Sequence, residues 1–191
     1  MTTPRELIQR SLQATANLHA QLAQQQGDAI ATAAELMATA MRNGHKLIWF
    51  GNGGSATQSQ HMAAEFVGRF STDRRSLPSI SLTENMASVT AIANDYGYRL
   101  IFARQLEGLS QPGDIAIGLS TSGSSANVLA GLQKAKTLGL TTIGLTGAAA
   151  EKMAPLCDAC VSVPTRETAR IQEAHLSIGH IWCALIEDAL R

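Results

Sequence analysis

Two side chains that can bind metals or transfer protons, His61 and Glu65, stand four residues apart in a stretch, 55–70, whose pattern predicts a helix. Residues four apart share one face of a helix, so both side chains can point at one ligand. This combination suits a metal site or an acid–base pair, although a lone His–Glu pair can also be a surface ion pair. The small residues between them, Ala63 and Ala64, leave room for a ligand.

The last predicted helix, 171–190, adds Gln172, His175 and His180 to the candidates. The two histidines are five residues apart, about 140° around a helix, so they cannot share a face. Gln172 and His180 are eight residues apart, about 12 Å along a helix axis. They could reach one ion only at full stretch or with the help of a bend. Spacing alone therefore does not choose between His175 and His180.

A glycine-rich loop, Gly51-Asn52-Gly53-Gly54-Ser55, lies between a predicted strand at 46–50 and the helix that carries His61. The glycines allow a ligand close to the backbone, and Ser55 is a good helix N-cap. Free N–H groups at a helix N-terminus attract anions. The loop is therefore either an ordinary tight turn or an anion site; it matches neither a GxGxxG nor a Walker A motif.

A hydroxyl-rich loop, Ser120-Thr121-Ser122-Gly123-Ser124-Ser125, follows the predicted strand 114–119. Five hydroxyls in six residues exceed what one helix cap needs. Hydroxyls and backbone N–H groups bind phosphate without requiring a cation. Two such loops after two strands of one sheet favour phosphate binding over two ordinary turns.

These loops need a scaffold, and the pattern after Asn43-Gly44 supplies one. Short apolar runs alternate with helical stretches, which is typical of a parallel sheet covered by helices on both faces. We expect an α/β fold with a five-stranded, parallel, doubly wound sheet, in which ligands bind beyond the carboxyl ends of the strands. The predicted strands are 46–50, 78–82, 114–119, 141–145 and 159–163. The predicted helices are 55–70, 87–109, 125–138 and 171–190.

The first 43 residues predict a helical arm with a break at Gly27-Asp28. Its apolar residues recur at helical spacing and can pack either on their own domain or on another subunit. We favour a second subunit, because a stripe without a partner in its own chain usually finds one by oligomerising. The stripe consists of Leu7, Leu12, Leu18, Leu22, Ile30, Ala34, Met37 and Met41.

Composition limits the possible partners and the location. Acidic and basic residues balance at 15 each, which argues against nucleic acid as a direct partner. We expect no signal peptide and no membrane span. The three cysteines include a CxxC, Cys157 to Cys160, which we interpret as buried thiols rather than a redox or zinc site. Together these features favour the cytoplasm.

The motifs, taken together, resemble those of the phosphoheptose isomerases, which are sugar-isomerase (SIS) domain proteins with a flavodoxin-like sheet. The resemblance spans almost the whole chain. It implies a single SIS domain over 1–191, with 1–43 as an arm used in oligomerisation and 44–191 as the α/β core. It rests on Gly51–Ser55, His61, Glu65, Asn94-Asp95, Ser120–Gly123, Arg170–Glu173 and His180.

The resemblance implies an aldose–ketose isomerase that converts sedoheptulose 7-phosphate to glycero-manno-heptose 7-phosphate. It implies a homotetramer with sites shared between subunits. It also implies Glu65 as catalytic base, His180 as catalytic acid, and zinc as cofactor. A residue bound to zinc is a poorer proton carrier, so the alternative is that these two residues act only as metal ligands and zinc polarises the carbonyl. The implied zinc ligands are His61, Glu65, Gln172 and His180. The implied substrate contacts are Asn52, Gly53, Gly54, Ser55, Glu65, Asn94, Asp95, Ser120, Thr121, Ser122, Ser125 and Gln172.

The chain departs from the family pattern at two positions. Gln58 stands where these enzymes usually carry Asp, and Ser124 stands where they usually carry Asn. Two other functions compete with the isomerase. One is a tetrameric scaffold like DiaA, which binds the initiator DnaA but lacks equivalents of Glu65 and His180. The other is a SIS-type sensor that binds a sugar phosphate without turning it over.

Overall fold

The computed structural model describes residues 2–191, so Met1, the first residue of the predicted arm, lies outside it. A parallel five-stranded sheet forms the middle layer, with strand order β2-β1-β3-β4-β5. This is the flavodoxin-like order, and the predicted fold class is confirmed. The strands are β1 (Leu47–Gly51), β2 (Ser79–Ser81), β3 (Ile115–Ser120), β4 (Thr141–Thr146) and β5 (Ala159–Ser162).

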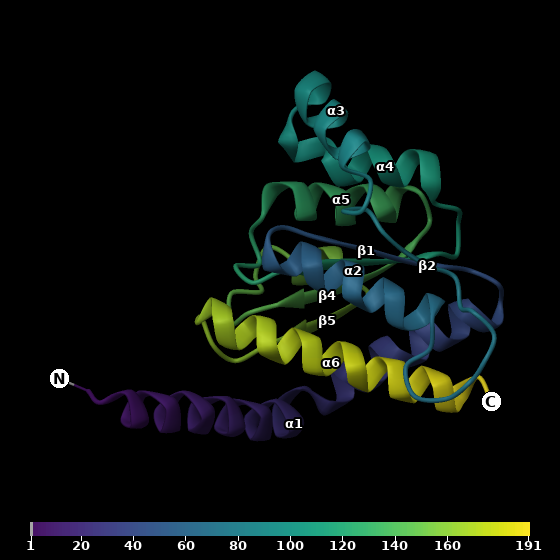
Figure 1. Cartoon of the computed structure of the whole chain (residues 1–191). Helices are drawn as coiled ribbons and strands as arrows, with labels where there is room; N and C mark the ends of the chain where they lie inside the picture. The colour runs from purple at the N-terminus through teal and green to yellow at the C-terminus, as the bar shows by residue number, and fades with distance from the viewer. Residues whose placement is uncertain (1) are drawn as a thin grey trace.

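Helices cover both faces of the sheet (Figure 1). On one face α1 (Pro4–Arg42), α2 (Gly54–Val67) and α6 (Thr168–Ala189) share a core with alternate residues of the strands. On the other face α4 (Ile101–Leu109) and α5 (Ala126–Thr137) build a second core. The strand runs are almost wholly buried, because a doubly covered parallel strand has no solvent face.

The order of the strands reverses between β1 and β3. Gly51 pairs with Leu119 at the carboxyl ends of these two strands. The glycine-rich and hydroxyl-rich loops therefore leave the sheet side by side. This is the position where open α/β sheets bind ligands.

Helix α1 is continuous from Pro4 to Arg42, so the predicted break at Gly27-Asp28 is wrong. Its stripe has two parts. Leu7 and Leu12 are exposed, at 54% and 67%. The other six stripe residues are buried within the chain. They pack on their own domain, so the expectation that they contact a second subunit is wrong for these six. The exposed part projects beyond the body of the molecule (Figure 1). Within residues 2–191, α1 and the other helices lack the length or hydropathy to cross a membrane.

The predicted helix 87–109 is two helices. It divides into α3 (Met86–Tyr96) and α4, with the 3-10 turn Tyr98–Leu100 between them. Gly97 adopts φ +87°, a conformation that glycine reaches without steric cost and that ends α3. Helix α3 has no buried residue and lies at the outer edge of the molecule (Figure 1).

Glu187 on α6 organises the segment that leads from α2 to β2. Its carboxylate is 3% exposed and accepts bonds from the backbone of Phe70, the hydroxyls of Ser71 and Thr72, and Nε of Arg74 at 2.9 Å. Burial alone would raise the pKa of Glu187, but the hydrogen bonds from Ser71 and its neighbours outweigh it and lower the pKa to about 2.

We expect Glu187→Gln to lower the free energy of unfolding by about 3 kcal/mol, because it leaves the partly buried Arg74 guanidinium without its counter-charge. Urea denaturation at pH 7 measures the change. Asp188→Asn is the matched control, since Asp188 is the next residue on α6 and its ion pair with Arg191 is exposed. Equal midpoints for the two variants would refute the role assigned to Glu187.

Candidate active site

The candidate site is built where α2 and α6 lie side by side and run in the same direction. At their first turns, Nε2 of Gln58 donates to the backbone oxygen of Gln172 at 2.5 Å. One to two turns further on, a Cβ on Gly179 would lie only 2.1 Å from Sδ of Met62. Glycine at 179 therefore permits the close approach of the two helices.

This packing brings His61, Glu65 and His180 together. The Nε2 atoms of His61 and His180 are 3.0 Å apart, and Nε2 of His61 is 3.2 Å from Oε1 of Glu65. The ring of Phe70 stacks on His180 with centroids 5.4 Å apart. The spacing on α2 does place both side chains on one face, and the shared partner is His180.

The three side chains fit a divalent metal ion. One ligand atom from each lies within 4.8 Å of the others. Two ligand atoms bound at 2.0–2.1 Å to a tetrahedral zinc ion lie about 3.3 Å apart, close to the two separations in this cluster. Two imidazoles and a carboxylate are also ligands that zinc accepts readily. The cluster is therefore a candidate metal centre that leaves a coordination position open.

Gln172, the fourth predicted ligand, lies against the glycine-rich loop. Its carboxamide rests on Gly54, where an added Cβ would be 2.4 Å from Nε2. Gln58, which replaces the usual Asp, holds the backbone of Gln172 through its amide donor; its own Oε1 is buried without a partner among residues 2–191. An ionised aspartate could not donate this bond.

The glycine-rich loop is held from the other face of the sheet. Asn52 forms a paired amide contact with Asn127 on α5, at 2.8 and 2.7 Å. The hydroxyl of Tyr98 donates to Oδ1 of Asn52 at 2.9 Å. Gly53 has φ +54°, and Ser55 is 3% exposed at the opening of α2. Side chains from α5 and from the turn after α3 thus hold Asn52 in the loop.

The hydroxyl-rich loop forms a compact network. The Ser120 hydroxyl lies 2.9 Å from that of Ser125 and 3.4 Å from that of Ser122, and the Ser124 hydroxyl donates to Ser122 at 3.1 Å. Gly123 makes the tight turn with φ +63°. The backbone N–H groups of Ser124 and Ser125 also donate to this network, to the Ser122 hydroxyl at 3.3 Å and the Ser120 hydroxyl at 3.5 Å. Donors and hydroxyls in such contacts can exchange them for a phosphate oxygen. The predicted residues Ser120, Thr121, Ser122 and Ser125 all line this turn.

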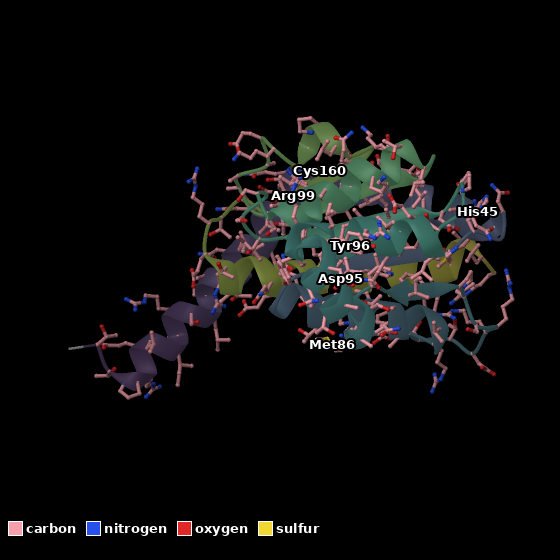
Figure 2. All side chains as sticks on the ribbon, turned by 90° about the horizontal axis from the view of Figure 1, so that it is seen from above. His45, Met86, Asp95, Tyr96, Arg99 and Cys160 are labelled. Carbon is pink, nitrogen blue, oxygen red and sulfur yellow. The ribbon has the colours of Figure 1, made fainter. Side chains whose placement is uncertain are left out.

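The predicted contacts Asn94 and Asp95 lie on α3. Asn94 donates to Asp95 at 2.8 Å, and both are exposed. Figure 2 shows Asp95, Tyr96 and Met86 on the outer side of the molecule. Tyr96, Tyr98 and Met86 are more than half exposed. Within residues 2–191 of one chain, neither Asn94 nor Asp95 forms a hydrogen bond or an ion pair with the cluster on α2 and α6.

His175, which spacing could not distinguish from His180, is 1% exposed and packs under β4. Its Nε2 lies 3.2 Å from the backbone oxygen of Thr146. Burial lowers the pKa of His175 to about 4, although the bond to Thr146 acts in the opposite direction. His175 is therefore neutral and structural, and His180 is the histidine that joins the cluster.

The lowered pKa of His175 predicts acid sensitivity. The unfolded chain binds a proton near pH 6.5 and the folded chain only near pH 4, so stability falls as the pH drops from 6.5 to 4. The loss is about 3 kcal/mol. His175→Gln lacks this titrating group. Between pH 7 and pH 4 its free energy of unfolding should therefore fall by about 3 kcal/mol less than that of the unsubstituted protein. Parallel pH profiles for both proteins would contradict the assignment.

Two of the three cysteines, Cys157 and Cys160, lie at the start of β5, and Cys183 lies on α6 one turn after His180. Cys183 is buried, as expected, and burial raises its pKa to about 12. Cys157 and Cys160 are half-buried rather than buried. Hydrogen bonding to Cys160 and burial raise the pKa of Cys157, so it is a protonated, weakly nucleophilic thiol.

Comparison with known proteins agrees with this geometry. The SIS domain family model matches residues 12–147. The phosphoheptose isomerase of Nitratiruptor sp. is 52% identical over 160 residues, which cover 84% of this chain and 86% of the relative. This chain belongs to the phosphoheptose isomerase family of SIS-domain proteins. The family's enzyme from Aneurinibacillus thermoaerophilus is 53% identical over 149 residues, covering 78% of this chain and 75% of the relative.

Solved structures of the same family superpose closely. The phosphoheptose isomerase from Neisseria gonorrhoeae has a TM-score of 0.92 and 34% identity, covering 97% of this chain and all of the other. The enzyme from Francisella tularensis has a TM-score of 0.90 and 32% identity, covering 97% of this chain and 99% of the other. The similarity includes α1 and α6, so it is not confined to the sheet.

Three residues that position the site carried no usable signal in the sequence. Asn127 and Tyr98 hold Asn52, and Phe70 covers His180. Each acts across tens of residues or more, and none lies in a motif. Tyr98 follows the helix-ending Gly97, and Asn127 lies two residues after the hydroxyl-rich loop, but neither position indicates a contact with Asn52.

Proposed function

We propose that this protein is an aldose–ketose isomerase that interconverts sedoheptulose 7-phosphate and glycero-manno-heptose 7-phosphate. The observation that carries the proposal is the His61–Glu65–His180 cluster beside two loops suited to phosphate. Family membership at about half identity supports the same reaction. A sugar-phosphate sensor would need the loops but not the cluster, and a scaffold that binds a protein would need neither.

The reaction moves a proton between C1 and C2 through an enediol. A base removes the proton from C1 of the ketose while the C2 oxygen gains one; C2 then gains a proton and the C1 hydroxyl loses its own, which leaves the aldehyde. We assign the carbon-proton transfers to Glu65 and the oxygen-proton transfers to His180. The loops after β1 and β3 would hold the phosphate end, with Asn52, Gly53, Gly54, Ser55, Ser120, Thr121, Ser122 and Ser125 as contacts.

We propose zinc as the metal, held by His61, Glu65 and His180, with Gln172 as the fourth ligand that the family resemblance implies. Bound zinc would supply Lewis-acid polarisation of the substrate's carbonyl oxygen. Gln58 would keep Gln172 at the mouth of this site through its bond to the Gln172 backbone.

We further propose a single SIS domain that assembles as a homotetramer with shared sites, using the arm 1–43. Two exposed features support this assembly. Leu7, Ile8 and Leu12 leave an apolar surface on α1, and α3 carries Asn94 and Asp95 without burying any residue of its own. A second subunit that covered α3 would bring these two residues toward a neighbour's site. Light scattering on the purified protein measures the assembly; a monomer at micromolar concentration would exclude it.

The direct test of the activity is incubation of sedoheptulose 7-phosphate with purified, zinc-supplemented protein. We expect an aldose 7-phosphate to form, detected by NMR. Unchanged substrate would exclude the isomerase. Retained binding of the sugar phosphate would then favour a sensor, and tight association with DnaA in a pull-down would favour the scaffold.

A further inference from the structure

A small cavity opens beside the hydroxyl-rich loop. Its volume is about 260 Å³, and it lies where the loops after β3, β4 and β5 meet. The lining residues are Thr121, Ser122, Ala148, Ala149, Arg166 and Thr168. Arg166 is the one charged residue in this lining.

Close backbone packing fixes Arg166 beside the loop. At Gly147, an added Cβ would lie 2.6 Å from the oxygen of Thr121 and 3.1 Å from the oxygen of Thr165. The backbone N–H of Ala148 also donates to the Thr165 oxygen at 3.0 Å. Gly147 thus lies between Thr121 and Thr165, the residue before Arg166, and close to both backbones.

The guanidinium of Arg166 is available to a ligand. Within residues 2–191 it forms no ion pair or hydrogen bond with another side chain, and it is exposed. The nearby Arg170 is committed instead: it bonds to Glu173, to the hydroxyls of Ser11 and Thr15 on α1, and lies 3.5 Å from Glu167. Arg166 is therefore an uncommitted cation beside Thr121 and Ser122 of the hydroxyl-rich loop. Arg99 and Lys152 line a different cavity, which reaches the loop at Ser124.

A sugar phosphate is mostly dianionic at neutral pH, because its second pKa is close to 6. Hydroxyls and N–H groups satisfy its oxygens but leave its charge uncompensated. A guanidinium pairs with phosphate through two parallel N–H donors and adds both charge and direction. Its position across the cavity from Thr121 and Ser122 matches that role.

We propose that Arg166 is a substrate-binding residue that neutralises the phosphate held by the hydroxyl-rich loop. This deepens the proposed function, because it names a specificity determinant of the same site. Arg166 favours substrates that end in a phosphate dianion over the corresponding neutral sugars, and it acts on binding rather than on the proton transfers.

Calorimetry with inorganic phosphate tests this assignment on the full-length, zinc-loaded protein. Arg166→Gln should weaken phosphate binding about tenfold, and Arg166→Lys, which keeps the charge but not the paired donors, should restore part of the loss. Raising the salt concentration should weaken binding to the unsubstituted protein more than to Arg166→Gln. Arg75→Gln, which removes an exposed arginine between α2 and β2 at the opposite edge of the sheet, should change nothing.

Turnover separates binding from catalysis. For sedoheptulose 7-phosphate, Arg166→Gln should raise KM about tenfold with kcat unchanged. Unchanged phosphate affinity in Arg166→Gln, or equal losses in Arg166→Gln and Arg166→Lys, would overturn the proposal. If the protein does not isomerise the sugar at all, the phosphate measurement still decides the role of Arg166 independently of the proposed reaction.

Discussion

Replacing His61 with alanine is expected to reduce kcat/KM for sedoheptulose 7-phosphate by on the order of 10³-fold, which corresponds to about 4 kcal/mol of transition-state stabilisation. His61 lies 3.0 Å from His180 and 3.2 Å from Glu65, so it is the central member of the cluster. Its loss removes one of the three proposed metal ligands and the group that contacts the other two. Steady-state kinetics and zinc content after dialysis measure the two consequences.

His45→Ala is the matched control for this change. His45 lies between α1 and β1, at an end of the molecule distant from Asp95 and Arg99 (Figure 2), and pairs loosely with Asp114 at 3.9 Å. It should retain zinc and activity within about twofold, as expected of a surface substitution away from the site. Equal zinc content in His61→Ala and the unsubstituted protein would reject the metal centre, whatever happens to the rate.

Gly123→Ala is expected to displace the hydroxyl-rich loop. Gly123 has φ +63°, and an added Cβ would lie 1.9 Å from the backbone oxygen of Ala149, which cannot turn away as a side chain could. We expect the free energy of unfolding to fall by about 2–3 kcal/mol. The affinity for inorganic phosphate should fall by tenfold or more, since each lost charge-assisted hydrogen bond is worth about 1.5–3 kcal/mol.

Gly108→Ala controls for the removal of a glycine as such. Gly108 lies in α4, has no atom within 4 Å of an added Cβ, and should gain about 0.5–1 kcal/mol from higher helix propensity. Thermal denaturation and phosphate calorimetry on both variants separate the two cases. Full phosphate affinity in Gly123→Ala would show that this loop does not bind the substrate's phosphate.

The sequence predicts the sheet and the loops well, because those features are local. Five buried apolar runs separated by helical stretches leave one reasonable class of architecture. The two ligand loops are marked by glycines and hydroxyls at strand ends, and their proximity follows from the reversal of strand order between β1 and β3. Gly97 is a local signal for a helix end, but the apolar residues on both sides of it favour one continuous helix, so the pattern predicts 87–109 as a single element.

The continuous course of α1 depends on contacts that no local pattern reports. Gly27 is exposed, and a helical glycine costs only about 1 kcal/mol relative to alanine. On either side of it, the Gln26 side chain accepts a bond from Ser162 at 3.1 Å, and the Ile30 backbone accepts one from Trp182 at 2.9 Å. These tertiary contacts outweigh the local preference for a break.

The candidate site divides in the same way. The shared face of His61 and Glu65 follows from helix geometry and needs no tertiary information. Their partner His180 is 119 residues from His61, and only the close approach of α2 and α6 at Gly179 brings it within 3.0 Å. Spacing alone could not choose it over His175, which turns inward to Thr146. It is the resemblance to the phosphoheptose isomerases that favours His180.

A zinc titration of the metal-free protein, followed by the rate of sedoheptulose 7-phosphate isomerisation, tests whether the His61–Glu65–His180 cluster is the working centre. We predict that activity rises in proportion to added zinc and levels off at one ion per chain. Full activity before any zinc is added, or none once one equivalent is bound, would contradict it.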